Sequence, residues 1–196
     1  LAHNDPGGAQ ELITPRASSG NIEALIVLGD ALAAQGQFEL AIKAWSQAGA
    51  YNTLINAAAD ANAANRFDEE LLALEAAYSI NPEKVASTLV ALLLDSNSEP
   101  QKVLNLLQDV IHQYPNSNNQ ADWNYLMGRV YAKEKLYDEA DIWFSRAIAF
   151  DSNSQWYWIM QANSARENGK LTYALNIYSQ AKKQFPDFAP LYFEMA

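Results

Sequence analysis

The order of small and aromatic positions along the chain predicts helices that pack closely on one another. Three segments share one pattern, in which an alanine is followed by an aromatic residue after four positions and by a second alanine after three more. Residues at this spacing lie on one face of an α-helix, and small side chains there let neighbouring backbones approach. The segments are centred on Trp45 (Ala41, Ala48), Phe144 (Ala140, Ala147) and Tyr178 (Ala174, Ala181).

A second helix is predicted before each of these segments. Two of these preceding helices carry an apolar residue, a glycine and a bulky residue three positions later, as in "LGDAL" and "MGRVY". A small residue recurs at the corresponding position at intervals of 29, 33, 37 and 34 residues. The five positions are Gly29, Ala58, Ala91, Gly128 and Ala162. A recurrence of this length indicates helix pairs that stack to bury a continuous core.

The combined pattern resembles the tetratricopeptide repeat (TPR) family, whose unit of about 34 residues carries W-x2-L-G-x2-Y, A-x3-F and a terminal proline. The resemblance implies an all-α fold: a right-handed superhelical solenoid of tandem helix-turn-helix repeats. Five repeats are expected, at residues 21–50, 51–83, 84–117, 118–153 and 154–187. Armadillo and HEAT repeats are the alternative, but their period is longer, at about 40–47 residues.

Both ends of the chain fall outside the five repeats. Residues 1–20 are rich in Gly, Pro, Ser and Asn and are predicted to form an extended lead-in. Residues 188–196, "FAPLYFEMA", are predicted to be the first helix of an incomplete sixth repeat. Such a helix leaves apolar side chains uncovered, and the face around Tyr178 and Ala181 is expected to be half covered. We therefore expect self-association through the C-terminal end.

Composition narrows the classes of function. The net charge of −10 disfavours binding to nucleic acid. The chain has no cysteine, and its two histidines, His3 and His112, lie far apart in the sequence. With no HExxH, Walker glycine loop or GxSxG motif, the sequence predicts no catalytic residues, no metal site and no cofactor. No apolar run approaches the length of a membrane helix, so direct membrane insertion of these residues is not expected.

The stretch "SQWYWIM" places Trp156, Tyr157 and Trp158 side by side. Consecutive residues on a helix lie about 100° apart, so the three rings cannot all face one core. The resemblance places Trp158 in the core and Tyr157 at an edge between repeats. It places Trp156 on the face that lines the concave groove in TPR proteins.

The same groove face collects aromatic, amide and cationic side chains in the fourth and fifth repeats. The predicted partner-binding residues are Tyr125, Arg129, Lys133, Trp156, Asn163 and Arg166. Aromatic rings beside cations suit a protein or peptide with an acidic group, and a polar glycan stacked on the rings is the alternative. A competing interpretation is that the cations are solvated or paired with Asp122 and Glu167.

The sequence therefore predicts a non-enzymatic scaffold or adaptor that mediates protein–protein interaction through a concave groove. The alternative is a soluble TPR domain excised from a larger enzyme. Bacterial membrane glycosyltransferases and oligosaccharide ligases carry repeat tails that this composition resembles. The partner's identity and the compartment stay open.

Overall fold

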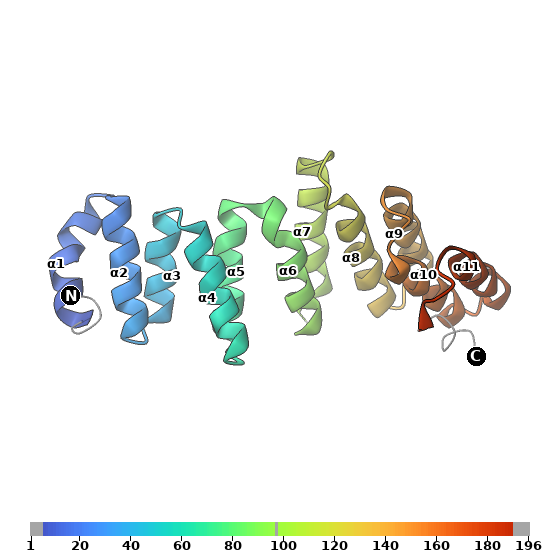
Figure 1. Cartoon of the computed structure of the whole chain (residues 1–196), viewed down its shortest axis with the longest axis horizontal. Coiled ribbons are helices and arrows are strands. Elements are labelled where there is room, and N and C mark those ends of the chain that lie inside the picture. The colour runs from blue at the N-terminus through green and yellow to red at the C-terminus, as the bar shows by residue number, and fades with distance from the viewer. Residues whose placement is uncertain (1–5, 97, 190–196) are drawn as a thin grey trace. The chain divides into compact units, whose positions relative to one another are not determined.

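The computed structural model describes residues 6–96 and 98–189 of the 196-residue chain, and these residues form α-helices without strands. The predicted all-α class is confirmed. The helices are α1 Pro6–Ser18, α2 Ile22–Ala34, α3 Phe38–Gln47, α4 Tyr51–Ala63, α5 Phe67–Ile80, α6 Pro82–Asp95, α7 Pro100–Gln113, α8 Gln120–Lys133, α9 Tyr137–Phe150, α10 Gln155–Glu167 and α11 Leu171–Gln184 (Figure 1). They form two compact units, Leu1–Leu89 and Val90–Ala196, and α6 begins in the first unit and ends in the second.

Four of the five expected repeat ranges contain two complete helices: α2 and α3 in residues 21–50, α4 and α5 in 51–83, α8 and α9 in 118–153, and α10 and α11 in 154–187. The third pair begins at Pro82, two residues before the expected range 84–117. Four pairs are joined by a three-residue turn whose middle residue has a positive φ, and these residues are Gly36, Asn65, Lys135 and Gly169. A left-handed residue at this point closes the last turn of the first helix and reverses the chain.

Residues Pro6–Ser18 form the helix α1, so the prediction of an extended lead-in is wrong for these residues. Ile13 and Ala17 lie four residues apart and pack against Ala24 and Leu25 of α2. This apolar contact overrides the unfavourable Pro15 inside the helix. Asn21 then caps α2, because its side-chain oxygen accepts a hydrogen bond of 2.8 Å from the Ala24 amide.

The small and aromatic positions that defined the repeat form the core of both units. Eight of the nine residues of the alanine–aromatic–alanine pattern are buried, and Ala48 is half-buried. In the first unit the Trp45 indole lies against Gly29, and its Nε1 donates to Asp30 Oδ1 at 3.1 Å. In the second unit the Phe144 ring lies against Gly128 in the same way. Glycine is needed at both positions because the ring occupies the space of a Cβ atom.

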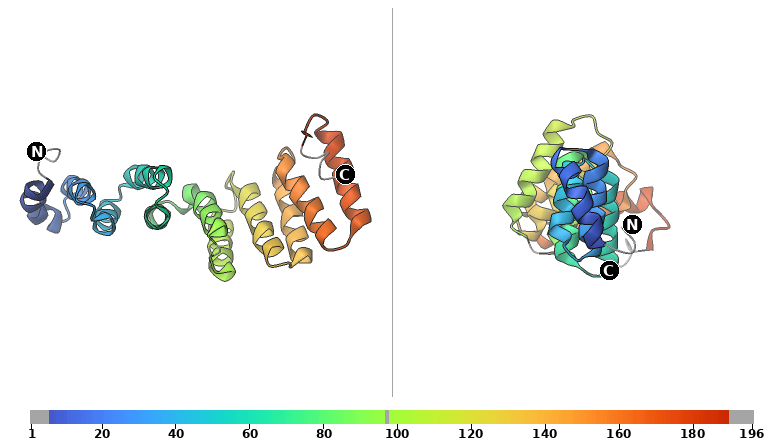
Figure 2. Two further views of the ribbon diagram at one scale, coloured as in Figure 1. Left: turned by 90° about the horizontal axis from the view of Figure 1, so that it is seen from below. Right: turned by 90° about the vertical axis from the view of Figure 1, so that its left-hand side faces the viewer.

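Figure 2 shows α8, α9, α10 and α11 following one another in the second unit, each packed on the next. Tyr178 and Ala181 of α11 are buried in a cluster with Ile159 of α10, with Phe185 and Phe188 packed against it. The expectation that this face is half covered is therefore wrong, because it faces the preceding helix. The expected sixth helix lies outside the described residues from residue 190 onward, and so does most of the surface expected to self-associate.

Within residues 6–96 and 98–189, no helix combines the length and the apolar character needed to cross a membrane.

Candidate functional site

Three of the predicted partner-binding residues share one face of α8. Tyr125, Arg129 and Lys133 follow one another at steps of four residues, which places them one above the other. The Tyr125 ring is half-buried, with its centroid 6.0 Å from that of Phe144 and 5.0 Å from that of Tyr157. Burial raises the pKa of the Tyr125 phenol, so this side chain is neutral at physiological pH.

Arg129 is oriented by the ring beneath it. Its guanidinium carbon lies 5.9 Å from the centroid of Tyr125, a distance at which the cation is attracted to the face of the ring. Lys133, one turn further on, donates from Nζ to the backbone oxygen of Leu94 at 2.6 Å. That carbonyl belongs to the last turn of α6, where a cation is favoured by the helix dipole.

Arg129 and Lys133 open onto one hollow of about 510 Å³. We call it the basic hollow, and it is lined by Leu94, Asp95, Arg129, Ala132, Lys133 and Met160. The sequence did not single out Asp95 as part of this site. It follows the small residue Ala91 by four positions, the same step that separates Ala162 from the predicted Arg166, and this correspondence could have found it.

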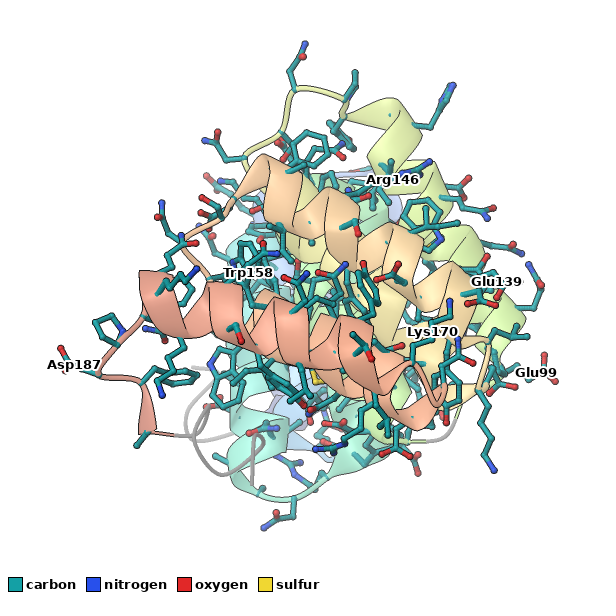
Figure 3. All side chains as sticks on the ribbon, turned by 90° about the vertical axis from the view of Figure 1, so that its right-hand side faces the viewer. Glu99, Glu139, Arg146, Trp158, Lys170 and Asp187 are labelled. Carbon is teal, nitrogen blue, oxygen red and sulfur yellow. The ribbon has the colours of Figure 1, made fainter. Side chains whose placement is uncertain are left out.

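The consecutive aromatic residues of α10 take three different environments. Trp156 is 53% exposed and meets the ring of Phe188 edge-on, with centroids 5.4 Å apart. Trp158 is half-buried against the core of α10 and α11, and its Nε1 donates to the Ser152 carbonyl at 3.0 Å. Figure 3 shows Trp158 at the end of this helix pair opposite to Lys170. The exposure of Trp156 and the core contact of Trp158 agree with what the sequence led us to expect.

Tyr157 lies between the fourth and fifth repeats, as expected, because it packs against Ala121 of α8 and Ala147 of α9. It is buried there, with only 5% of its surface exposed. Burial is possible because its hydroxyl donates to the carboxylate of Asp122, which lies 35 residues earlier on α8. Burial, this hydrogen bond and the charges of Asp122 and Asp151 raise the pKa of Tyr157 well above its ordinary value. The phenol therefore stays protonated and acts as a donor.

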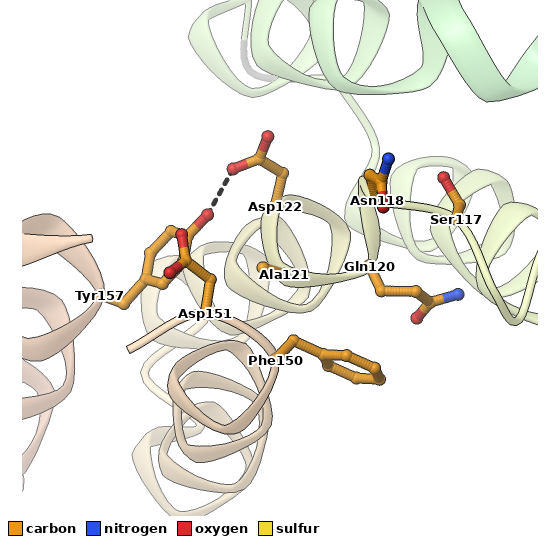
Figure 4. Close-up of a pocket in the computed structure, with 8 residues that line it drawn as sticks. All are labelled: Ser117, Asn118, Gln120, Ala121, Asp122, Phe150, Asp151 and Tyr157. Atoms are coloured by element: carbon orange, nitrogen blue, oxygen red, sulfur yellow. Dashed lines mark hydrogen bonds between the residues drawn. The ribbon is translucent and has the colours of Figure 1, made fainter. Parts of the chain in front are cut away.

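Tyr157 and Asp122 border a second cavity of about 270 Å³, which we call the acidic pocket (Figure 4). Its lining residues are Ser117, Asn118, Gln120, Ala121, Asp122, Phe150, Asp151 and Tyr157. No periodic pattern in the sequence identifies this pocket, because it depends on contacts between helices.

Asn163 and Arg166, the remaining predicted residues, are engaged at the contact of α10 with α11. The Tyr178 hydroxyl donates to Asn163 Oδ1, and Arg166 Nη1 lies 3.5 Å from the same hydroxyl. Arg166 Nε also lies 3.7 Å from Glu167 Oε1, as the competing interpretation expected. Asp122 instead bonds to Tyr157. The structure therefore groups Arg129 and Lys133 at one hollow with Tyr125 beside them, and Trp156, Asn163 and Arg166 do not line that hollow.

The described residues contain no group of three or more His, Cys, Asp or Glu side chains placed to hold a metal ion.

No protein-family model and no curated protein sequence matches the chain. Solved structures do match it. The structure of YrrB, described as a TPR protein with an unusual peptide-binding site, superposes with a TM-score of 0.64 over 94% of this chain and 97% of YrrB, at 17% identity. The chain has the TPR fold.

Two further structures carry the same fold. TTC0263, a thermophilic TPR protein of Thermus thermophilus, gives a TM-score of 0.60 at 19% identity and covers 88% of this chain and 96% of TTC0263. A chain of the APC/C hetero-tetramer Cut9–Hcn1 gives a TM-score of 0.63 at 16% identity and covers 97% of this chain but 39% of that one. At these identities the likeness establishes the TPR fold, and function is argued from the site.

Proposed function

We propose that this TPR-fold chain is a non-enzymatic adaptor that binds a protein or peptide segment bearing an acidic group. The observation that carries the proposal is the pair of cations, Arg129 and Lys133, at one hollow of about 510 Å³. Leu94, Ala132 and Met160 give the hollow apolar walls beside these charges. Pockets that combine apolar walls with a few fixed polar groups are the common form of binding sites in proteins.

The similar structures support this class of function. YrrB is described as having a peptide-binding site, and Cut9–Hcn1 is a complex of two different proteins. An array of helix pairs presents a large continuous surface, which favours the binding of other proteins over catalysis.

Each cation has a distinct role in the proposal. Arg129, which the Tyr125 ring orients, presents its planar guanidinium to a carboxylate and forms two parallel hydrogen bonds. Lys133 adds a positive charge, and one of its three N–H groups continues to donate a hydrogen bond to the Leu94 carbonyl oxygen. On α10, the exposed Trp156 offers a ring for stacking, and Asn163 and Arg166, which both contact the Tyr178 hydroxyl, add an amide and a cation about two to three helical turns further on.

Titration with a defined probe tests the proposal. A fluorescein-labelled peptide with a single glutamate and blocked ends is added at low salt, and binding is followed by anisotropy. Arg129→Gln is expected to weaken binding roughly threefold to tenfold, because a charged contact at a partly exposed site contributes on the order of 1 kcal/mol. Trp156→Ala tests the contribution of α10 in the same assay.

Arg146→Gln is the matched control. It removes the same charge from α9, where the Arg146 guanidinium lies 4.4 Å from the centroid of the Trp143 ring and does not line the basic hollow. If Arg146→Gln and Arg129→Gln weaken peptide binding equally, the effect comes from the net charge of the protein and not from a contact in the basic hollow. Binding that survives Arg129→Gln and Lys133→Gln but is lost in Trp156→Ala would move the site to α10 and bring the glycan alternative forward.

A further inference from the structure

The charge along one face of α8 changes from negative to positive between the first turn of the helix and its last turns. Asp122, Tyr125, Arg129 and Lys133 follow one another at steps of three, four and four residues, so they lie on one face of the helix. The carboxylate is in the first turn, the ring is in the middle, and the two cations are toward the end. A cavity lies at each end of this row: the acidic pocket beside Asp122 and the basic hollow beside Arg129 and Lys133.

The acidic end keeps capacity for a cationic partner. Asp122 is exposed and accepts the hydrogen bond from Tyr157, which uses one of about four acceptor positions of a carboxylate. Asp151, at the C-terminal end of α9, accepts a bond of 2.9 Å from the Asn153 amide in its own loop. Neither carboxylate forms an ion pair within the part of the chain that the structure describes.

We propose that the α8 face binds a segment carrying both a basic and an acidic group and fixes the direction in which that segment lies. This inference rests on the proposed function and specifies its partner. The basic side chain enters the acidic pocket between Asp122 and Asp151, and the acidic group meets Arg129 and Lys133. Tyr125, between the two ends, provides an apolar surface for the part of the segment that joins them.

The geometry sets the spacing of the two groups. Asp122 and Arg129 are separated by seven helical residues, or about 10 Å, and Asp122 and Lys133 by eleven, or about 16 Å, at 1.5 Å per residue. An extended peptide advances about 3.3 Å per residue, so its two charged residues should lie roughly three to five positions apart. A segment with acidic groups at both positions would meet Asp122 and Asp151 with like charge and bind more weakly.

A set of four matched peptides tests this inference. All have blocked ends and a central leucine, and they differ only at two positions separated by three residues: Lys and Glu, Gln and Glu, Glu and Glu, or Lys and Lys. Each is titrated at low salt into the 15N-labelled protein, and amide shifts report affinity and location. The Lys–Glu peptide is expected to bind about threefold to fivefold more tightly than the Gln–Glu peptide, as for one partly exposed ion pair.

A charge reversal provides the second readout. In Asp151→Lys the Glu–Glu and Lys–Glu peptides are expected to bind about equally, because Asp122 remains and the net charge of the two side chains at the acidic pocket falls to zero; the preference found in the unmodified protein is therefore lost. Asp109→Lys is the matched control, since Asp109 is an exposed residue of α7 that lines neither cavity. It should leave the order unchanged.

The outcomes separate this inference from the proposed function. One set of results would contradict the inference alone. The Gln–Glu peptide would bind as tightly as the Lys–Glu peptide, Asp151→Lys would change neither affinity, and Arg129→Gln would weaken the binding of both peptides. The α8 face would then not recognise a basic group, and the proposed binding of an acidic group would stand. If none of the four peptides shifts the amides of α8, both are wrong. Circular dichroism of each variant shows that the fold is retained.

Discussion

At the scale of single residues, two of the helix pairs share one close contact. An aromatic ring of the second helix occupies the space that a side chain at a glycine of the first helix would need. A Cβ atom added to Gly128 would lie 2.6 Å from two carbons of the Phe144 ring, which is closer than van der Waals contact allows. Gly29 and Trp45 repeat the arrangement, with 2.3 Å to the indole nitrogen. Both aromatic side chains are buried, so neither ring can move aside without disturbing the core.

Gly128→Ala should therefore destabilise the protein. In an open helix the same change would stabilise by about 1 kcal/mol through helix propensity. Here we expect a net loss of about 1–3 kcal/mol from overpacking, measured by urea unfolding. In a Phe144→Leu background, where the ring is absent, the loss should be smaller, because the two sites share one contact. An increase in stability on Gly128→Ala in the unmodified protein would contradict the prediction.

The same scale shows what the sequence could predict about the site. The proximity of Arg129 and Lys133 to each other follows from their four-residue spacing, which depends on helix geometry alone, whereas their choice as partner-binding residues comes from the resemblance to TPR proteins. The burial of Tyr157 could not be predicted in this way, because its hydroxyl is satisfied by Asp122 from another helix pair. The basic hollow depends on Leu94, Asp95 and Met160, which come from α6 and α10, so spacing within α8 does not reveal it.

At the scale of helices, α1 shows how tertiary contact overrides composition. Its two glycines, two prolines and one serine favour an irregular chain, and Pro15 interrupts the hydrogen bonding of the helix. Two apolar side chains, Ile13 and Ala17, nevertheless supply the contact with α2. The repeat pattern located α2 to α11 because each of these helices carries the periodic apolar face. It missed α1 because the apolar signal there is limited to these few positions.

Ala17→Glu tests whether this contact holds α1 in place. Ala17 is 6% exposed, so a carboxylate there is either buried without a partner or forces α1 away from α2. Faster hydrogen exchange is expected across Pro6–Ser18, followed by mass spectrometry. Leu12→Glu introduces the same charge on the same helix at a side chain that is 71% exposed, and it should leave exchange nearly unchanged. Equal acceleration by both changes would show that helix propensity, and not the contact with α2, decides the outcome.

At the scale of the whole molecule, the chain consists of two compact units, and repeat arrays are stabilised mainly by contacts between neighbouring helices. A change in one unit should therefore act mainly within that unit. Two fully buried leucines allow a matched comparison: Leu54 of α4 in the first unit and Leu107 of α7 in the second, each 0% exposed. Truncation of either to alanine leaves a cavity and is expected to cost about 2–5 kcal/mol locally.

Native-state hydrogen exchange shows which helices lose stability when either leucine is truncated. Leu54→Ala should lower protection in α2 to α5 by more than in α8 to α11, and Leu107→Ala should do the reverse. The reason is that the free energy of opening a segment depends on the contacts of that segment and its neighbours, and the cavity removes such contacts in one unit only. If either substitution lowers protection by the same amount in both sets of helices, the chain opens as one cooperative structure and the two units have no separate stability. An exposed truncation in the second unit, Leu175→Ala, should leave protection in both sets nearly unchanged, because this side chain is 53% exposed and little apolar contact is lost.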